Sequence, residues 1–116
     1  SHAVWKAVSE TGDAIGYGVA GTLSLPVKNA SNRALELKRL YVKSGFQSQG
    51  LGDRLMTTFF AWAEQYGYPE LYLGVYAENH AAQRFYQRHG FQKVGDYLFP
   101  VGRHRDLEFI YKRMAV

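Results

Sequence analysis

The sequence has no cysteine, and it has only three prolines and two methionines among its 116 residues. Without cysteine there is no disulfide framework, no thiolate-bound zinc and no cysteine nucleophile. No apolar run approaches the ~18–20 residues that a membrane span needs, and residues 1–13 contain no apolar segment typical of a secretory signal. We therefore expect a cytoplasmic protein that has no membrane partner.

What the chain does contain is typical of one folded domain, residues 1–116. Hydrophobic residues make up 47% and aromatic residues 16% of the sequence, which is too much for a disordered chain. The 14 basic residues exceed the 10 acidic ones by four, so the net charge is +4. This excess mildly favours an anionic ligand without identifying it.

Periodicity predicts six strands and two helices in the order β-β-β-α-β-α-β-β. A strand–helix–strand succession in the middle implies at least one parallel pair, so we expect an α/β (α+β) domain with a mixed central sheet. The polar segments 26–32, 43–49 and 100–106 are expected to be loops. The predicted strands are residues 3–9, 14–25, 33–42, 70–76, 91–99 and 107–114, and the predicted helices are residues 50–66 and 81–90, the second capped by Asn79.

Side-chain spacing also predicts which residues pack inside. Glycines 16, 18 and 21 interrupt the second strand and indicate a bulge or a close backbone approach. The apolar stripe of the first helix is expected to contain Leu51, Leu55, Phe59, Trp62 or Ala63, and Tyr66. Tyr17, Phe59, Phe60, Trp62, Tyr72 and Phe85 are the aromatic residues expected to face the core.

The junction between the third strand and the first helix is the segment most suggestive of chemistry. A helix N-terminus presents unpaired backbone N–H groups and the positive end of the helix dipole, which together bind phosphate. Gly50 and Gly52 would let a pyrophosphate approach the backbone closely. The segment is not a Walker sequence, and Leu55 stands where a dinucleotide fingerprint needs its third glycine. An ordinary loop and helix start is the alternative.

Three separated pieces of the chain resemble the GCN5-related N-acetyltransferases. ELKRLYV followed by QSQGLG looks like that family's acetyl-CoA motif, (Arg/Gln)-x-x-Gly-x-(Gly/Ala). Asn79-x-x-Ala82-x-x-x-Tyr86-x-x-x-Gly90-Phe91 looks like its second motif helix. The strand LYLGV lies between them, as in the family, and the resemblance covers residues 3–114.

The chain departs from the family pattern in one respect. The strand and two helices that usually precede the hairpin at residues 3–25, and that form one wall of the acceptor site, are absent. The resemblance implies an acetyl-CoA-dependent N-acetyltransferase. Because of this departure, a catalytically inactive acyl-CoA-binding or oligomerisation module is the alternative.

The resemblance also implies how acetyl-CoA, the co-substrate, would bind. The pantetheine arm would bond to the backbone of Leu40, Tyr41 and Val42, where parallel strands separate, and to Asn79. Arg84 or Arg88 would meet the 3′-phosphate. The pyrophosphate would bind along Gln47, Ser48, Gln49, Gly50, Leu51, Gly52 and Asp53.

Direct transfer of the acetyl group to a primary amine is the implied reaction. Glu36, eleven residues before Gln47, would deprotonate the amine directly or through one water; water alone, Glu78 or Glu108 are the alternatives. Tyr86, which would also contact the coenzyme, would protonate the leaving thiolate, and the Val42 N–H would stabilise the oxyanion. No metal is expected, because the four histidines show no ligand spacing.

The acceptor and the partners are less constrained. Residues 91–99, Gly102 and residues 106–111 faintly resemble polyamine-type acetyltransferases of the family. Protein N-termini, lysine side chains, amino sugars and aminoglycosides stay open as acceptors. No nucleic-acid partner is expected, because Arg103, His104 and Arg105 form a small basic group without interleaved aromatics. An exposed sheet edge makes a homodimer plausible.

Overall fold

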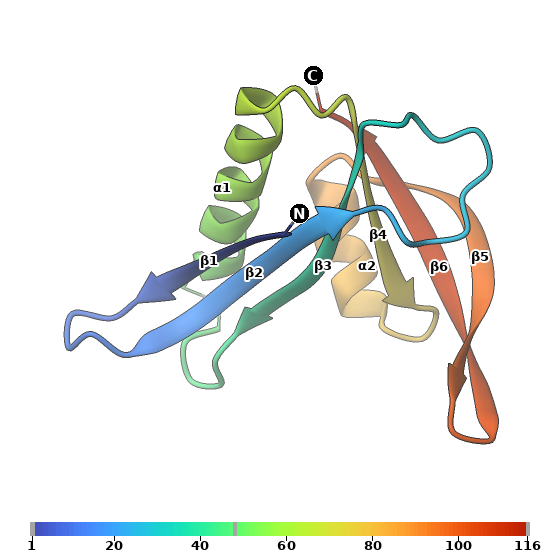
Figure 1. Ribbon diagram of the computed structural model, residues 1–116. Coiled ribbons are helices and arrows are strands. Elements are labelled where there is room, and N and C mark those ends of the chain that lie inside the picture. The colour runs from blue at the N-terminus through green and yellow to red at the C-terminus, as the bar shows by residue number, and fades with distance from the viewer. Residues whose placement is uncertain (1, 48, 116) are drawn as a thin grey trace.

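The computed structural model describes residues 2–47 and 49–115 and contains the eight predicted elements in the predicted order (Figure 1). They are β1 (His2–Val8), β2 (Ala14–Thr22), β3 (Ala34–Val42), α1 (Leu51–Gln65), β4 (Glu70–Tyr76), α2 (His80–Arg88), β5 (Gln92–Val101) and β6 (His104–Met114).

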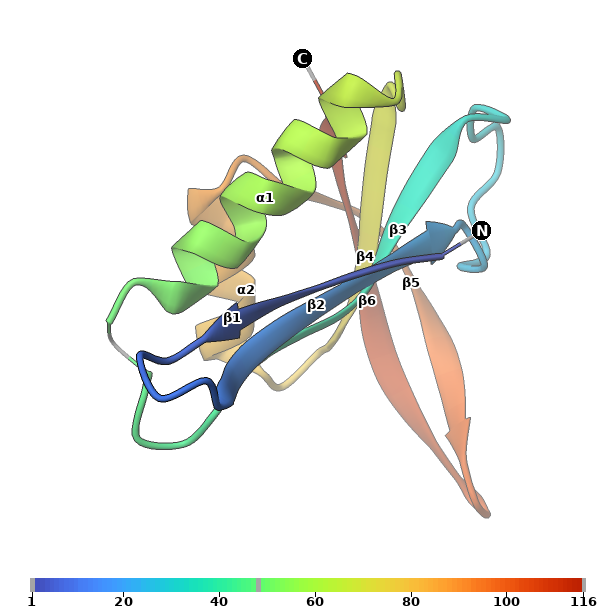
Figure 2. The same ribbon diagram turned by 60° about the vertical axis from the view of Figure 1, so that its left-hand side comes forward.

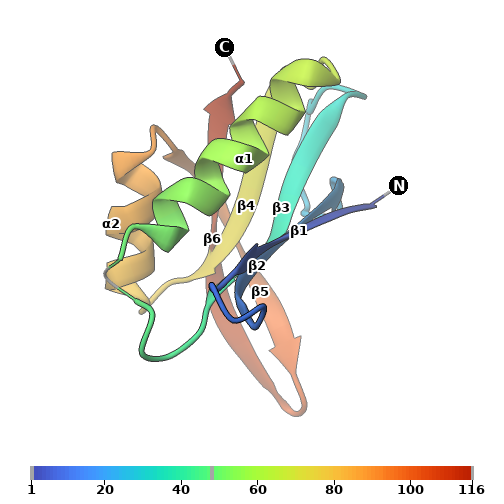
Figure 3. The ribbon, with the colours of Figure 1, turned by 90° about the vertical axis from the view of Figure 1, so that its left-hand side faces the viewer.

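The six strands form one twisted mixed sheet in the order β1-β2-β3-β4-β6-β5. The β3–β4 pair is parallel and the other four pairs are antiparallel, which confirms the predicted mixed α/β (α+β) sheet. Both helices lie on the same face of this sheet, as Figures 2 and 3 show from two sides. The sheet therefore has one face covered by helices and one without them.

The main core lies between the helices and the sheet. Alternate residues of β3 and β4, among them Leu35, Leu37 and Leu73, pack there against α1. The buried residues of α1 are Leu51, Leu55, Met56, Phe59 and Ala63. The prediction left open whether Trp62 or Ala63 belongs to the stripe, and Ala63 is the buried one. The predicted stripe missed Met56 and was wrong for Tyr66, which is 52% exposed because α1 ends before it.

The opposite face has a smaller core. Ala34, Tyr72 and Ile110 project from β3, β4 and β6 and are buried there. The β2–β3 loop covers them with the partly buried side chains of Leu23, Leu25, Val27 and Ala30. The aromatic core prediction holds fully for Phe59 and Tyr72, while Tyr17, Phe60, Trp62 and Phe85 are half-buried.

Glycine in β2 does mark a close approach. A Cβ on Gly18 would collide with the indole of Trp5 on β1, and one on Gly16 would lie 2.9 Å from the Tyr41 carbonyl oxygen. The Trp5 indole in turn donates to the Leu55 carbonyl (3.1 Å). Gly18 thereby leaves room for the Trp5 indole, whose hydrogen bond links β1 to α1.

Two predicted boundaries were wrong. β2 ends at Thr22 rather than at residue 25, because residues 23–25 turn onto the helix-free face. Most of the predicted loop 100–106 is strand, because Gly102 (φ 59°) turns the chain tightly and pairs Val101 with His104. Within the parts of the chain that the structure describes, neither helix is long and apolar enough to cross a membrane.

Candidate active site

The parallel strands β3 and β4 separate soon after their pairing begins. β3 and β4 pair through Ala34–Glu36 and Glu70–Tyr72, and their pairing ends there. Beyond Glu36, β3 continues with β2 as its partner, while β4 pairs with β6. Figure 1 shows the two strands diverging toward their C-terminal ends. Glu36 therefore stands at the last paired position before the opening.

The backbone of β3 faces this opening at alternate residues. The Lys43 N–H donates to the Ile15 carbonyl (2.7 Å), so residue 43 is bonded to the β2 side. In an antiparallel pair the bonding direction alternates. Tyr41, opposite Tyr17, therefore bonds toward β2, whereas Leu40 and Val42 point their N–H and C=O groups toward the opening. Of the three predicted backbone partners of pantetheine, the register favours these two.

The loop before α1 leads into a helix N-terminus whose N-cap residue, a glycine, has no side chain to cap it. Gly50 is the N-cap residue, with φ 76°, and its carbonyl accepts from the Arg54 N–H (3.1 Å). Among residues 2–47 and 49–115, no side chain bonds to the first-turn N–H groups. These donors and the helix dipole are thus available to an anion.

A cavity of about 230 Å³ lies at this N-terminus. It brings together five predicted coenzyme-binding positions of the junction, one from β3, and two side chains from α2. Its lining is Val42, Phe46, Gln47, Gly50, Leu51, Gly52, Asp53, Phe85 and Arg88. Gln49 instead lines a separate hollow beside the β1–β2 hairpin. Ser48, also predicted to bind the coenzyme, lies outside the described residues.

Gly50 and Gly52 are required for different physical reasons. Gly50 has a left-handed backbone, and a Cβ there would meet nothing within 4 Å. A Cβ on Gly52 would lie 3.2 Å from the Phe85 ring. The space that a missing Cβ leaves for a pyrophosphate is therefore open at Gly50, whereas at Gly52 the Phe85 ring of α2 occupies it.

Asp53 connects the two helices. Its carboxylate accepts from His89 Nε2 (2.7 Å) and from Arg88 Nη1 (3.1 Å). The hydrogen bond from His89, and then the contact with Arg88, hold the pKa of Asp53 below its ordinary value. The Asp53 side chain is an anion, so a phosphate in the cavity would meet its backbone and not its carboxylate.

Glu36 projects toward the helix-free face and is 8% exposed. One carboxylate oxygen, Oε1, accepts from the Ser24 N–H (2.8 Å), the Ser24 hydroxyl (3.0 Å) and Lys38 Nζ (3.3 Å). Among the described residues, none donates to the other oxygen, Oε2. These donors fix the position of the carboxylate. No sequence pattern indicated that Ser24, twelve residues away, would bind Glu36.

Tyr86 lies on α2, on the other side of the sheet. It is half-buried and packs edge-on against Phe85 and Phe91, with ring centroids 5.4 and 6.0 Å away. This burial raises the pKa of its phenol. Tyr86 does not line the 230 Å³ cavity, and neither does Glu36, so the structure does not bring the two predicted catalytic groups onto that cavity.

Asn79 has a structural task that the sequence indicated. Its Oδ1 accepts from the Ala82 N–H (3.1 Å), which caps α2. The side-chain amide is exposed and keeps its N–H donors for another acceptor. The two alternative bases are engaged by tyrosines: Glu78 accepts from Tyr76, and Glu108 from Tyr97 (3.3 Å).

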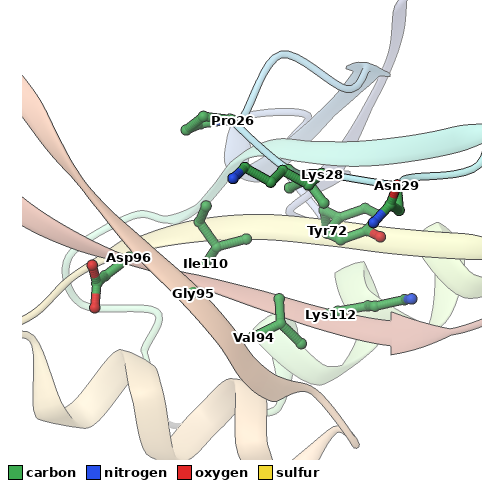
Figure 4. Close-up of a pocket in the computed structure, with 10 residues that line it drawn as sticks. Pro26, Lys28, Asn29, Tyr72, Val94, Gly95, Asp96, Ile110 and Lys112 are labelled. Atoms are coloured by element: carbon green, nitrogen blue, oxygen red, sulfur yellow. The ribbon is translucent and has the colours of Figure 1, made fainter.

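A larger cavity, of about 450 Å³, opens on the helix-free face (Figure 4). Tyr72 and Ile110 form its floor, and Lys28, Lys112 and Asp96 bring charge to it. Its lining is Pro26, Val27, Lys28, Asn29, Tyr72, Val94, Gly95, Asp96, Ile110 and Lys112. Two ammonium groups against one carboxylate do not favour a polycation inside it.

A family model for the acetyltransferase (GNAT) family matches residues 1–91, which is more than half of the chain. The chain belongs to this GNAT family. The match covers the predicted coenzyme motif at Gln47–Gly52 and the helix that carries Tyr86. The resemblance drawn from the sequence is thus confirmed.

Curated GNAT relatives match this chain over part of their length. An uncharacterised N-acetyltransferase of Lactobacillus delbrueckii is 32% identical over 103 residues, which are 84% of this chain and 60% of the relative. The spermine/spermidine N(1)-acetyltransferase of Bacillus subtilis is 30% identical over 89 residues, covering 76% and 59%. The chain therefore spans little more than half the length of these relatives.

Solved structures agree on the fold. Nourseothricin acetyltransferase superimposes with a TM-score of 0.84 at 21% identity, covering 99% of this chain and 66% of that protein. The PaiA N-acetyltransferase of Thermoplasma acidophilum, solved with coenzyme A, gives a TM-score of 0.75 at 20% identity and covers 97% and 60%. At these identities the similarity establishes the GNAT architecture.

Proposed function

We propose that this GNAT domain transfers the acetyl group of acetyl-CoA directly to a primary amine. The observation that carries the proposal is the separation of β3 from β4 beside a glycine-capped helix N-terminus. That arrangement offers phosphate donors at Gly50–Gly52 and peptide-like donors and acceptors at Leu40 and Val42. A molecule with phosphates at one end and an amide-containing arm at the other fits both.

In the proposed reaction, Glu36 removes a proton from the amine, directly or through one water. The neutral nitrogen attacks the thioester carbon, and the Val42 N–H donates to the oxyanion that forms. The carbon–sulfur bond then breaks, and the Tyr86 phenol gives its proton to the sulfur. The nitrogen of the adduct loses its second proton to solvent as the amide forms, and Glu36 releases the proton that it took from the amine. The products are the acetylated amine and coenzyme A, and the tyrosinate regains its proton from solvent.

The family and its relatives support this choice of substrates. One relative is named a spermine/spermidine N(1)-acetyltransferase, and one structural neighbour was solved with coenzyme A. We extend acetyl-CoA and a primary-amine acceptor to this chain, with polyamines among the acceptors to test. A cytoplasmic location, the absence of nucleic-acid and membrane partners, and a homodimer stay predictions.

The second candidate is an acyl-CoA-binding or oligomerisation module without catalysis. It is favoured by the packing of Tyr86, whose half-buried ring does not line the cavity at Gly50. It shares the coenzyme site with the first candidate and differs from it only in turnover.

Release of free thiol from acetyl-CoA separates the two candidates. Because the chain has no cysteine, any thiol that appears in the assay is coenzyme A. We expect thiol to appear with a primary amine, such as spermidine or a lysine peptide, above the rate without amine. Coenzyme binding without amine-dependent thiol release from any acceptor class would contradict the transferase and support the module.

Glu36→Gln is expected to lower turnover about 10²-fold or more, since a general base typically contributes ~10²–10⁴-fold. Glutamine keeps an oxygen for the donors of Ser24 and Lys38, so the fold should be retained. The rate is measured against pH in both proteins, and the acidic limb should flatten in the variant.

Glu70→Gln is the matched control. Glu70 is also a strand carboxylate and accepts from the Ser31 N–H and the Tyr72 hydroxyl, but it lies at the start of β4, away from the opening. It should leave the profile unchanged. If Glu36→Gln also leaves it unchanged, the proton leaves through water or through another group.

A further inference from the structure

The ammonium group of Lys38 lies against the carboxylate proposed as the general base. Its Nζ donates to Glu36 Oε1 (3.3 Å) and to the Ser24 hydroxyl (2.8 Å). Two other lysines, Lys93 and Lys112, meet carboxylates only at 3.9 Å. The chain thus places a primary amine of its own in direct contact with the group that would deprotonate an acceptor.

A break in the strand pairing directs Lys38 to this contact. Leu37 and Arg39 pair with adjacent residues of β2, and Lys38 between them has no partner there. An unpaired residue of this kind bends its strand and re-aims its side chain. Lys38 also lies two residues beyond the last β3 position that pairs with β4. Its side chain therefore starts within the opening between the two strands.

The order of residues along β3 places this amine between the base and the coenzyme. Lys38 follows Glu36 and precedes Leu40 and Val42, whose backbone groups face the opening and are proposed to bond to the pantetheine arm. The Lys38 side chain is 23% exposed, so it is not enclosed by the fold. Its four-carbon stem lets the nitrogen move while the backbone stays in place.

We propose that the chain acetylates its own Lys38. This inference rests on the proposed acetyl transfer and adds an internal acceptor and a modification site to it. A neutral amine attacks a thioester and an ammonium group does not, so contact with a carboxylate base distinguishes Lys38 from the other lysines.

The step balances as follows from the groups already named. The Lys38 nitrogen gives one proton to Glu36, bonds to the thioester carbon of acetyl-CoA, and loses a second proton to solvent as the amide forms. The carbon–sulfur bond breaks, and the sulfur takes the proton of Tyr86. Glu36 then releases its proton and Tyr86 regains one from solvent, which leaves acetyl-lysine at position 38 and free coenzyme A.

Peptide mass spectrometry of the chain after incubation with acetyl-CoA, without any added amine, tests the proposal. Lys112 is the internal control, because its side chain also lies near a strand carboxylate, that of Glu70, and is 31% exposed. Purely chemical acetylation would favour this more exposed lysine. We expect acetylation of Lys38 to be about 10²-fold faster or more, since a general base typically contributes ~10²–10⁴-fold.

Two variants and a dilution series identify the route. Lys38→Arg keeps the positive charge and removes the acceptor, so it should abolish the burst of free coenzyme A that the wild-type chain releases without added amine. Glu36→Gln should slow the modification of Lys38 about 10²-fold. The rate constant should not depend on protein concentration, because acceptor and base belong to one chain. Unfolding temperatures show that both variants are folded.

Each contrary result has a definite meaning. Acetylation of Lys38 no faster than that of Lys112, a rate that Glu36→Gln leaves unchanged, or a rate constant that rises with protein concentration would overturn this inference. Thiol release with spermidine from a chain whose Lys38 stays unmodified would overturn this inference alone. A chain that acetylates neither Lys38 nor spermidine nor a lysine peptide would overturn the proposed transferase, and this inference with it.

Discussion

Tyr86→Phe is expected to lower turnover by about 10²–10⁴-fold, the range typical of a lost general acid, while the dissociation constant of acetyl-CoA stays near its wild-type value. The substitution removes only a hydroxyl, which makes no hydrogen bond to the residues that the structure describes. Its ring contacts with Phe85 and Phe91 remain, so stability should change little.

The pH dependence of this role has a definite sign. Burial raises the pKa of Tyr86, so its phenol keeps its proton beyond the ordinary tyrosine range and remains a donor at neutral and mildly alkaline pH. The activity that depends on Tyr86 should therefore be lost only at high pH, and Tyr86→Phe should remove that basic limb.

Single-turnover and steady-state rates measure the effect, and Tyr66→Phe serves as the control. Tyr66 follows the end of α1 and is more than half exposed. Unchanged turnover in Tyr86→Phe would exclude Tyr86 from the mechanism and leave its ring as a packing element of α2.

Gly52→Asp is expected to abolish coenzyme binding, with an affinity loss beyond about 100-fold. The new Cβ would lie 3.2 Å from the Phe85 ring, and the carboxylate would enter the cavity proposed to hold the coenzyme phosphates. Charge and volume act together. The added carboxylate repels phosphate, and the added Cβ displaces the Phe85 ring, over which the Arg88 guanidinium lies.

Graded substitutions separate these two causes. Gly52→Ala adds the Cβ alone, and Gly52→Asn adds the volume of aspartate without its charge. Affinity measured by titration should fall in the order Gly, Ala, Asn, Asp, with each variant folded at the temperature of the assay. Near wild-type affinity in Gly52→Asp would contradict the placement of the phosphates.

Much of the fold was predictable because its signals are local. Residues 70–76 form a short apolar run, and β4 has those same bounds. Gly50 precedes α1 and Gly67 follows it, and both have left-handed backbones. The predicted helix, residues 50–66, has nearly the same bounds. The polar character of residues 100–106 wrongly indicated a loop, because one glycine, Gly102, sufficed for a turn between two long strands.

The site was predictable where it depends on a continuous motif. Gln47, Gly50, Leu51 and Gly52 do meet at one cavity. What the sequence did not indicate is long-range pairing: Ser24 holding Glu36, Phe85 filling the space at Gly52, and the link from Asp53 to His89. Periodicity reports which face a side chain occupies, but it does not report which partner from another element it meets there.

The proposed binding of acetyl-CoA at the N-terminus of α1 is tested first by thermal unfolding with acetyl-CoA, coenzyme A, ATP and NAD. A ligand present at 100 times its dissociation constant adds about 2.7 kcal/mol to the free energy of unfolding. We predict a clear rise in the unfolding temperature with acetyl-CoA and coenzyme A, a smaller rise or none with ATP and NAD, and loss of the response in Gly52→Asp. No response to either form of coenzyme A, or an equal response in Gly52→Asp, would contradict the account.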